Sequence, residues 1–190
     1  MAGLGSVFAS RGPDPLPIAI RLETPGDEPG VRRVHEAAFT GPEEADIVDR
    51  LRREAPAGWQ SLVAVDADGR VVGHVLLSPC PVEDEDGERV GEVLALGPIA
   101  VLPEVQLRGV GSALMTTAVG LAVARAVPAI VLLGHPSYYP RFGFGSARDA
   151  GLEPPAAAWP DSAWMARRLP AWTDSSRGTV RYPEAFKPFA

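Results

Sequence analysis

The stretch that decides the fold is PIAVLPEVQLRGVGSAL, residues 98–114. Its first part has the apolar, β-branched character of a strand, and from Gly109 onward the apolar residues recur at helical spacing. The first N–H groups of a helix have no partner within the helix, and the helix dipole is positive there, so such a turn binds phosphate. Glycine at 109 and 111 lets a bulky diphosphate approach the backbone, and Arg108 can add charge from the rim.

The segment after the turn reads as a helix followed by a strand. Apolar residues fall on one helical stripe from Val110 to Leu121, and Pro128 closes the helix. A short, wholly apolar strand is predicted over residues 129–133. A strand, a helix and another strand form a βαβ unit, whose two strands are parallel and whose crossover is right-handed.

The rest of the chain supplies further strands and two more helices. Helices are predicted near residues 31–38 and 47–55, on either side of the break at Gly41-Pro42, and we expect both to pack on a sheet. Asp-Gly pairs at 68–69 and 86–87 indicate hairpins, which make the middle of the chain an antiparallel meander. The other predicted strands are residues 18–22, 61–65, 70–77, 90–101, 164–169 and 179–182.

Length and composition predict one domain. The 190 residues are 46% hydrophobic, enough for a single buried core. Residues 1–17 are rich in Gly, Pro and Ser without an apolar signal region, so we predict a disordered tail ahead of one domain over residues 18–190. The sequence contains no run of about 18 apolar residues, so no membrane span is predicted. Cys80 is the single cysteine, so we expect a core thiol, no disulfide and a cytoplasmic location.

The formal charge of −6 argues against a general nucleic-acid binder, which normally presents a basic face. A basic partner suits this surface better. Five acids lie within residues 83–88, and they could attract a cationic substrate. A solvated hairpin loop is the favoured interpretation, because charge runs usually mark exposed turns.

The glycine turn lacks the Lys-Ser/Thr pair of a P-loop and the three-glycine spacing of a dinucleotide fingerprint. Gln106-x-x-Gly109-x-Gly111 instead resembles the Q/R-x-x-G-x-G/A signature of the GNAT superfamily of N-acetyltransferases. Residues 96–101 resemble that family's fourth strand, and GHPSYYPRFGF, residues 134–144, resembles its Tyr-x-x-x-Gly-Phe segment after the fifth strand. This segment, together with RYPEAF at residues 181–186, most resembles the YhbS-like branch of the family. The likeness runs from about Ile18 to Phe186.

The resemblance implies an α/β fold of the α+β kind, with helices flanking a mixed central sheet of about six to seven strands. The fourth and fifth strands would part in a V, with a bulge at Gly97-Pro98 because proline cannot donate to a central ladder. Backbone N–H groups of residues 107–112 would hold the pyrophosphate of acetyl-CoA, and residues 99–101 would pair with its pantetheine arm. Many family members have glycine where this chain has Leu107. The residues assigned to acetyl-CoA are Ile99, Ala100, Val101, Gln106, Leu107, Arg108, Gly109, Val110, Gly111 and Ser112.

The family's general acid corresponds to Tyr139, which could alternatively pack against the cofactor, and Tyr138 could exchange roles with it. His135 is a candidate general base, although a structural hydrogen-bonding role is equally open. Glu92 lies three positions before the glutamate that some members use, where this chain has Ala95.

Other polar and aromatic residues receive structural interpretations. No trio of His, Cys, Asp or Glu has metal-ligand spacing, so no metal is predicted. We expect His35 and His74 to be satisfied core or surface residues. Trp159, Trp164 and Trp172 could line an acceptor pocket, but anchoring the proline-rich C-terminal part to the core is favoured.

The resulting hypothesis is a transferase that moves an acetyl group from acetyl-CoA to a primary amine, by direct attack in a ternary complex. The acceptor is expected to be a small molecule or a peptide, with neither nucleic acid nor membrane as a partner. A homodimer stays open. Two alternatives also stay open: an acyl-CoA-binding regulatory module without turnover, and an acyltransferase that uses another acyl-CoA or an O-acceptor.

Overall fold

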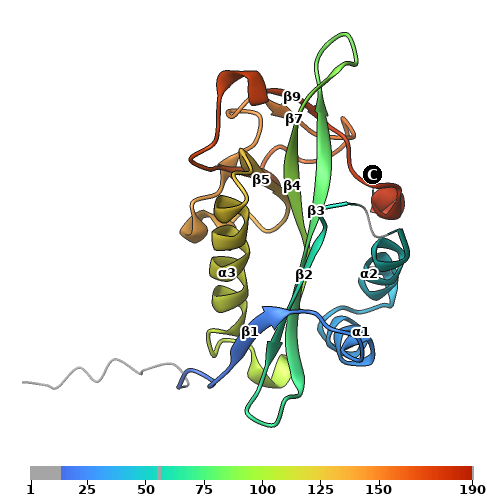
Figure 1. Cartoon of the computed structure of the whole chain (residues 1–190), viewed down its shortest axis with the longest axis vertical. Helices are drawn as coiled ribbons and strands as arrows, with labels where there is room; N and C mark the ends of the chain where they lie inside the picture. Colours follow the sequence, from blue (N-terminus) through green and yellow to red (C-terminus); the bar gives the residue numbers. More distant parts are fainter. Residues whose placement is uncertain (1–13, 55–56, 190) are drawn as a thin grey trace, which may run out of the picture.

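The computed structural model describes residues 14–54 and 57–189, which are organised around one twisted mixed sheet (Figure 1). The main strand order is β1-β2-β3-β4-β5-β8-β6, and β9 pairs with both β3 and β7. The strands are β1 (Ala19–Leu22), β2 (Gln60–Val65), β3 (Val71–Glu83), β4 (Arg89–Val101), β5 (Ala129–Leu133), β6 (Gly145–Ser146), β7 (Leu152–Glu153), β8 (Trp164–Arg168) and β9 (Gly178–Val180).

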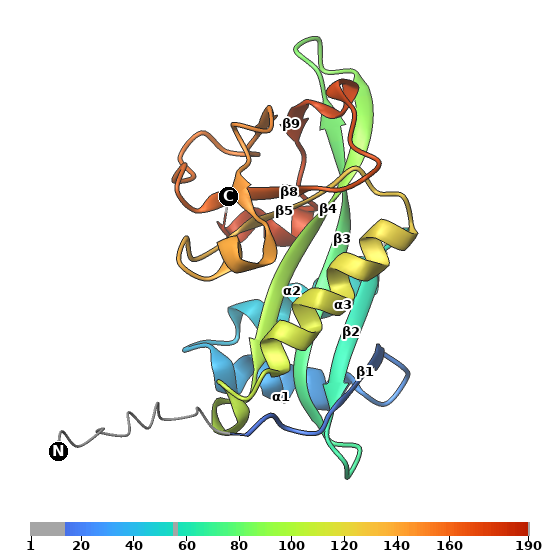
Figure 2. The ribbon, with the colours of Figure 1, turned by 90° about the vertical axis from the view of Figure 1, so that its left-hand side faces the viewer.

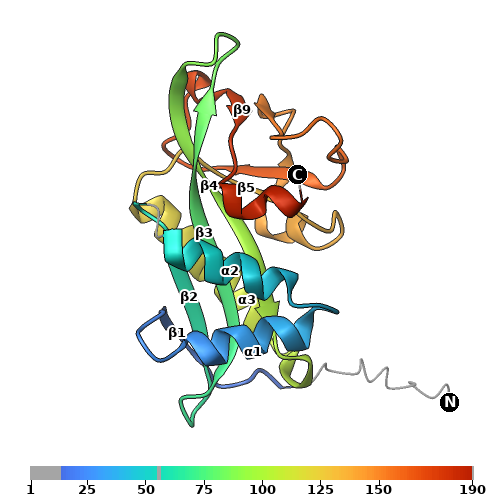
Figure 3. The ribbon, with the colours of Figure 1, turned by 90° about the vertical axis from the view of Figure 1, so that its right-hand side faces the viewer.

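Helices cover both faces of this sheet. The helix α3 (Val110–Ala124) crosses one face (Figure 2), and α1 (Glu28–Ala38) and α2 (Glu43–Glu54) cover the other (Figure 3). Four short 3-10 helices complete the fold: η1 (Pro103–Val105), η2 (Tyr139–Phe142), η3 (Asp174–Ser176) and η4 (Glu184–Phe189). The predicted mixed sheet flanked by helices is therefore confirmed.

Both predicted hairpins are present. In the β2–β3 turn the Asp66 amide donates to the Arg70 carbonyl at 3.0 Å, and Gly69 takes the left-handed backbone that the turn needs, with φ +78°. The β3–β4 turn has the same construction, with Gly87 at φ +81°. Glu85 and Glu88 are exposed at its tip, so the acidic stretch is a solvated hairpin, as the favoured interpretation held.

The βαβ unit consists of β4, α3 and β5. β4 and β5 are parallel, but they pair only at Leu94 with Ile130 and at Ala95 with Val131. Beyond Ala95 the two strands separate, which is the predicted V-shaped split. On its other edge β5 pairs with β8 over its full length, from Ala129 to Leu133.

A bulge in β4 lies where the split begins. Against β3, Val75 faces Ile99 and Leu77 faces Leu96, so Gly97 and Pro98 together stand opposite one residue. Proline has no N–H to donate, and Gly97 takes φ +142°, which is open to glycine. The bulge predicted for Gly97-Pro98 is confirmed.

The C-terminal part departs most from the sequence prediction. β6 and β7 have two residues each and carry no detectable alternation, so about six to seven strands were expected where nine form within the described part of the chain. Trp164 anchors this region: it is fully buried, and its Nε1–H donates to the Leu152 carbonyl at 2.8 Å.

The predicted tail, residues 1–17, lies mostly outside the described residues. Its last part, from Asp14, runs beside the turn that precedes α3. The Leu16 amide donates to the Arg108 carbonyl at 3.2 Å, and Arg108 Nε donates to the Asp14 carbonyl at 3.0 Å. Within the ranges that the structure places, no helix is long and apolar enough to cross a membrane.

A chain of polar side chains is buried between α1 and the sheet. Ser61 Oγ donates to the carboxylate of Glu23, which also accepts from Arg52 at 2.7 Å. Since the hydroxyl has one hydrogen, His74 Nε2–H must donate to Ser61 Oγ at 2.8 Å, and His35 Nε2–H to His74 Nδ1 at 2.8 Å. Burial lowers the pKa of both histidines, so each ring is neutral near pH 7 and carries one ring proton, as these hydrogen bonds require. His35 Nδ1 is a buried acceptor with no partner among the described atoms, so the expectation of a satisfied histidine fails for this atom.

Burial lowers the pKa of His35 to about 4 and that of His74 well below its ordinary value. Because the folded pKa lies below the unfolded one, the unfolded chain takes up protons first as the pH falls from about 6.5 toward 4. We expect the free energy of unfolding, measured by urea denaturation, to fall by about 3 kcal/mol over this window from His35 alone.

His35→Leu should flatten this pH dependence while lowering stability at pH 7.5. Leu114→Val, a core change on α3 and so on the sheet face opposite to His35, should lower stability equally at both ends of the window and serves as the control. An unchanged slope in His35→Leu would contradict the assignment.

Candidate functional site

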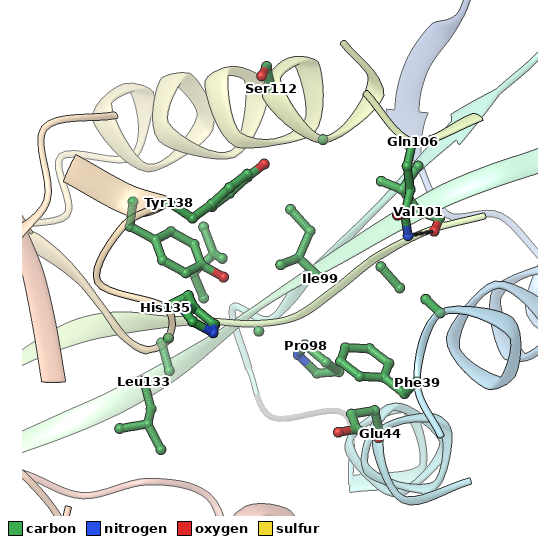
Figure 4. A pocket seen from close by; sticks show the side chains of 18 of the residues that line it. Phe39, Glu44, Pro98, Ile99, Val101, Gln106, Ser112, Leu133, His135 and Tyr138 are labelled. Carbon is green, nitrogen blue, oxygen red and sulfur yellow. Dashed lines mark hydrogen bonds between the residues drawn. The ribbon is translucent and has the colours of Figure 1, made fainter. Parts of the chain in front are cut away.

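A cleft of about 1070 Å³ opens where β4 and β5 part (Figure 4). It is lined on one side by the start of α3 and on the other by α1 and α2, with the bulged part of β4 between them. A cleft of this size is large enough for a cofactor-sized ligand and a second small molecule.

The N-terminal turn of α3 is built to receive an anion. Gly109 is the N-cap residue with φ +87°, and within this fully described helix no side chain caps the first turn and no first-turn residue is acidic. The intrahelical ladder begins at Ala113, whose amide donates to Gly109 at 2.9 Å. The preceding N–H groups and the positive end of the helix dipole thus face the cleft without compensation.

Leu107 takes the left-handed conformation with φ +60°, and 93% of its surface is exposed. This backbone suits glycine better than leucine, because a β-carbon disfavours left-handed φ by about 1–2 kcal/mol. The side chain points away from the protein, as expected for a turn that acts through its backbone.

The structure brings eight of the ten residues assigned to acetyl-CoA to the cleft wall, namely Ile99, Ala100, Val101, Gln106, Leu107, Gly109, Gly111 and Ser112. Gln106 Nε2 donates to the Val101 carbonyl at 3.1 Å and so ties the turn to the end of β4 (Figure 4). Val110 does not line the cleft, because its side chain is buried in the core.

The side chain of Arg108 also lies outside the cleft wall, since it is engaged by the Asp14 carbonyl. Arg141, which the sequence analysis did not single out, is the cleft's arginine instead. Its guanidinium lies 4.0 Å from the centre of the Tyr138 ring, and its Nε donates to the Tyr138 carbonyl at 2.9 Å.

Tyr138 and Tyr139 both line the cleft but differ in environment. Tyr138 points toward α3 (Figure 4), and its hydroxyl would lie 2.9 Å from a Cβ placed on Gly111. Tyr139 is 9% exposed and packs edge-on against Phe144 and Tyr138. Burial, and then the neighbouring Tyr138, raise the pKa of Tyr139 to about 12, so its hydroxyl keeps its proton.

His135 is exposed at the cleft wall, on the segment that follows β5 (Figure 4). Glu92 lies away from the cleft and pairs with Arg89 at 2.7 Å, whereas Ala95 lines the cleft. Cys80 is fully buried, and burial raises the pKa of its thiol to about 12, as suits a core residue. Among the placed side chains, no three His, Cys, Asp or Glu residues group to hold a metal.

The half of the cleft facing α1 and α2 was largely missed by the sequence analysis. Its wall holds the rings of Phe39, Trp159, Tyr182 and Phe186, and the carboxylate of Glu44. Glu44 lies in the first turn of α2, which begins at Glu43, and acidic residues are typical of a helix N-terminus. Of the three tryptophans considered, Trp159 lines the cleft; Trp164 and Trp172 do not.

Comparison with known proteins fits this geometry. The GNAT acetyltransferase family model matches residues 29–144. The chain is 33% identical to the N-acetyltransferase YhbS of Escherichia coli K12, whose reaction is uncharacterized, over 90% of this chain and 99% of YhbS. It is 31% identical to YjhQ, another uncharacterized N-acetyltransferase of that strain, over 82% of this chain and 86% of YjhQ.

Solved structures agree. The crystal structure of E. coli YhbS in complex with CoA superposes with a TM-score of 0.80 and 30% identity, covering 95% of this chain and 98% of that one. The crystal structure of a Brucella melitensis GNAT acetyltransferase in complex with acetyl-CoA superposes with a TM-score of 0.71. The two sequences are 32% identical, and the match covers 89% of this chain and 97% of that one. From the split sheet, the uncapped glycine turn and these matches together, we conclude that this chain belongs to the GNAT acetyltransferase family.

Proposed function

We propose that the protein transfers an acetyl group from acetyl-CoA to a primary amine within a ternary complex, without a covalent enzyme intermediate. The observation that carries the proposal is the loss of pairing between β4 and β5 after Ala95, directly beside the uncapped start of α3. The acceptor is a small molecule or a peptide amine, and a cytoplasmic location is part of the proposal.

Two adjoining features support binding of acetyl-CoA. Ile99, Ala100 and Val101 of β4 pair with β3 along one edge of the strand and line the cleft along the other. The backbone N–H and C=O groups on the cleft edge can therefore pair with an extended pantetheine arm. The α3 turn offers N–H groups and a positive dipole to the pyrophosphate. The structures of the two relatives, which hold CoA and acetyl-CoA, support the same assignment.

Acetyl-CoA supplies an activated thioester carbonyl. The primary amine arrives as an ammonium, so it first loses one proton. In the transfer, its nitrogen then forms a C–N bond as the C–S bond breaks, the nitrogen loses a second proton, and the sulfur gains one, so that one proton is released overall. Tyr139 is the proposed proton donor to the sulfur, because its raised pKa keeps the phenol protonated at neutral pH. His135 is the proposed acceptor of the amine proton, since it lies exposed on the same wall.

Replacing Gly111 with Val should weaken CoA binding by about 10- to 100-fold, because a side chain there meets the Tyr138 hydroxyl and Val101 and obstructs the turn. Calorimetric titration with CoA measures the effect. Gly120→Val is the matched control: Gly120 lies on the same helix with open space around its Cβ position. Equal CoA affinity in the two folded variants would remove the proposed pyrophosphate site.

Tyr139→Phe should lower kcat by about ten- to a thousand-fold with little change in CoA affinity, because ring packing persists while the proton donor is lost. Release of free thiol from acetyl-CoA in the presence of an amine measures the rate. Tyr138→Phe should act on CoA affinity instead, since that hydroxyl lies over the α3 turn.

A wild-type kcat in Tyr139→Phe would leave Tyr139 as a packing residue. A wild-type protein that binds CoA yet releases no thiol with any amine would instead be an acyl-CoA-binding module.

A further inference from the structure

The cleft has a second half whose chemistry differs from that of the α3 turn. Its walls come from α1, α2, the segment after β5 and the C-terminal part of the chain, and they are apolar apart from a few groups. Among the cleft-lining residues of the described chain, Glu44 is the one carboxylate (Figure 4). The amine acceptor of the proposed reaction must enter this half, because the other holds the proposed cofactor site.

Glu44 is half-buried and makes no hydrogen bond or ion pair with any described residue. Other acids of α2 are paired: Asp46 and Asp49 both bind Arg32, at 3.1 and 2.7 Å. The arginine of the cleft does not serve Glu44, because its guanidinium stacks on Tyr138, which points toward α3. An unpaired carboxylate in an apolar wall is complementary to a cation that arrives with a ligand.

The body of that ligand meets aromatic rings. Trp159 and Tyr182 lie edge to face with ring centres 5.2 Å apart, and Tyr182 and Phe186 are also 5.2 Å apart. Phe186 belongs to η4, which packs beside α2 (Figure 3), and Phe39 lines the same cleft as Glu44 (Figure 4). Aromatic walls favour a flat apolar group of comparable size.

We propose that the acceptor is an arylalkyl primary amine, whose ammonium binds Glu44 and whose ring packs among Phe39, Trp159, Tyr182 and Phe186. This proposal rests on the proposed function and adds the class of substrate. Polyamines fit poorly, because the same half offers no second carboxylate among the described residues for a second ammonium. An amino acid fits poorly because its carboxylate would lie beside Glu44.

The test is calorimetric titration of the CoA-saturated protein with 2-phenylethylamine at pH 7.5. Glu44→Gln should weaken binding by about 10- to 100-fold, as expected for a lost charge-assisted hydrogen bond. Glu43→Gln is the matched control, since Glu43 loses the same charge on the same helical turn but is exposed and lies outside the cleft wall. The Glu43→Gln variant should bind 2-phenylethylamine with the affinity of the wild type.

Three further ligands separate charge from shape. 2-Phenylethanol, which has no ammonium, should bind wild type and Glu44→Gln equally. 2-Cyclohexylethylamine should bind about 2- to 10-fold more weakly than 2-phenylethylamine, because it lacks the aromatic face. Phenylalanine should bind at least about 10-fold more weakly because of its carboxylate.

Equal 2-phenylethylamine affinity in wild type and Glu44→Gln, or tighter binding of spermidine than of 2-phenylethylamine, would overturn the proposal. These titrations need no turnover, so they are independent of the transfer reaction. Thiol release with spermidine but not with 2-phenylethylamine would overturn this inference and leave the acetyltransferase proposal standing. If the amines bind as expected but no amine causes thiol release, the acetyltransferase proposal is overturned, and the cleft remains a binding site for arylalkyl amines.

Discussion

The site depends on one constraint in the sheet: β4 stays hydrogen-bonded to β3 along its length but pairs with β5 only as far as Ala95. Pro98 has no N–H, and the bulge at Gly97-Pro98 changes the register against β3 at the point where pairing with β5 has just ended. β5 keeps β8 as its partner on the other edge along its whole length. A central strand with a free edge inside a protein is unusual, because unpaired backbone groups are costly when buried. Here those groups face a cleft, and a ligand can satisfy them.

The connection between the parted strands determines what kind of ligand fits. The crossover from β4 to β5 is the α3 segment, so the positive end of that helix lies at the mouth of the split. The right-handed βαβ connection thereby joins an edge that suits an extended chain to a turn that suits an anion. In the proposed binding mode, the one stretch from Ile99 to Ser112 serves both parts of an acyl-CoA, and α1, α2 and the C-terminal part of the chain build the opposite wall.

Much of this was predictable from the sequence because it is local. The glycine turn, the α3 stripe, the Asp-Gly hairpins and the Gly97-Pro98 bulge each follow from residues adjacent in the chain. Conversely, β6 and β7 are too short to show a period, and their pairing is decided by packing around Trp164. The wall around Glu44 combines residues from about 40 to 186, and no single segment carries a signal for it. The side chain of Arg108 was misplaced for a related reason, since its partner, Asp14, lies far away in sequence.

The buried chain of Glu23, Ser61, His74 and His35 has a consequence for how the meander assembles. Glu23 follows β1, His35 lies on α1, and Ser61 and His74 lie on β2 and β3, so one hydrogen-bonded line links four elements of the fold. Each donor has one acceptor, and the line runs in a single direction. A one-residue shift between β2 and β3 would turn either Ser61 or His74 to the opposite face of the sheet. The remaining polar side chains would then be buried without hydrogen-bond partners. The hydrogen-bonded line thus specifies the register of β2 against β3. The valine-rich and leucine-rich strands alone would distinguish less well between neighbouring registers.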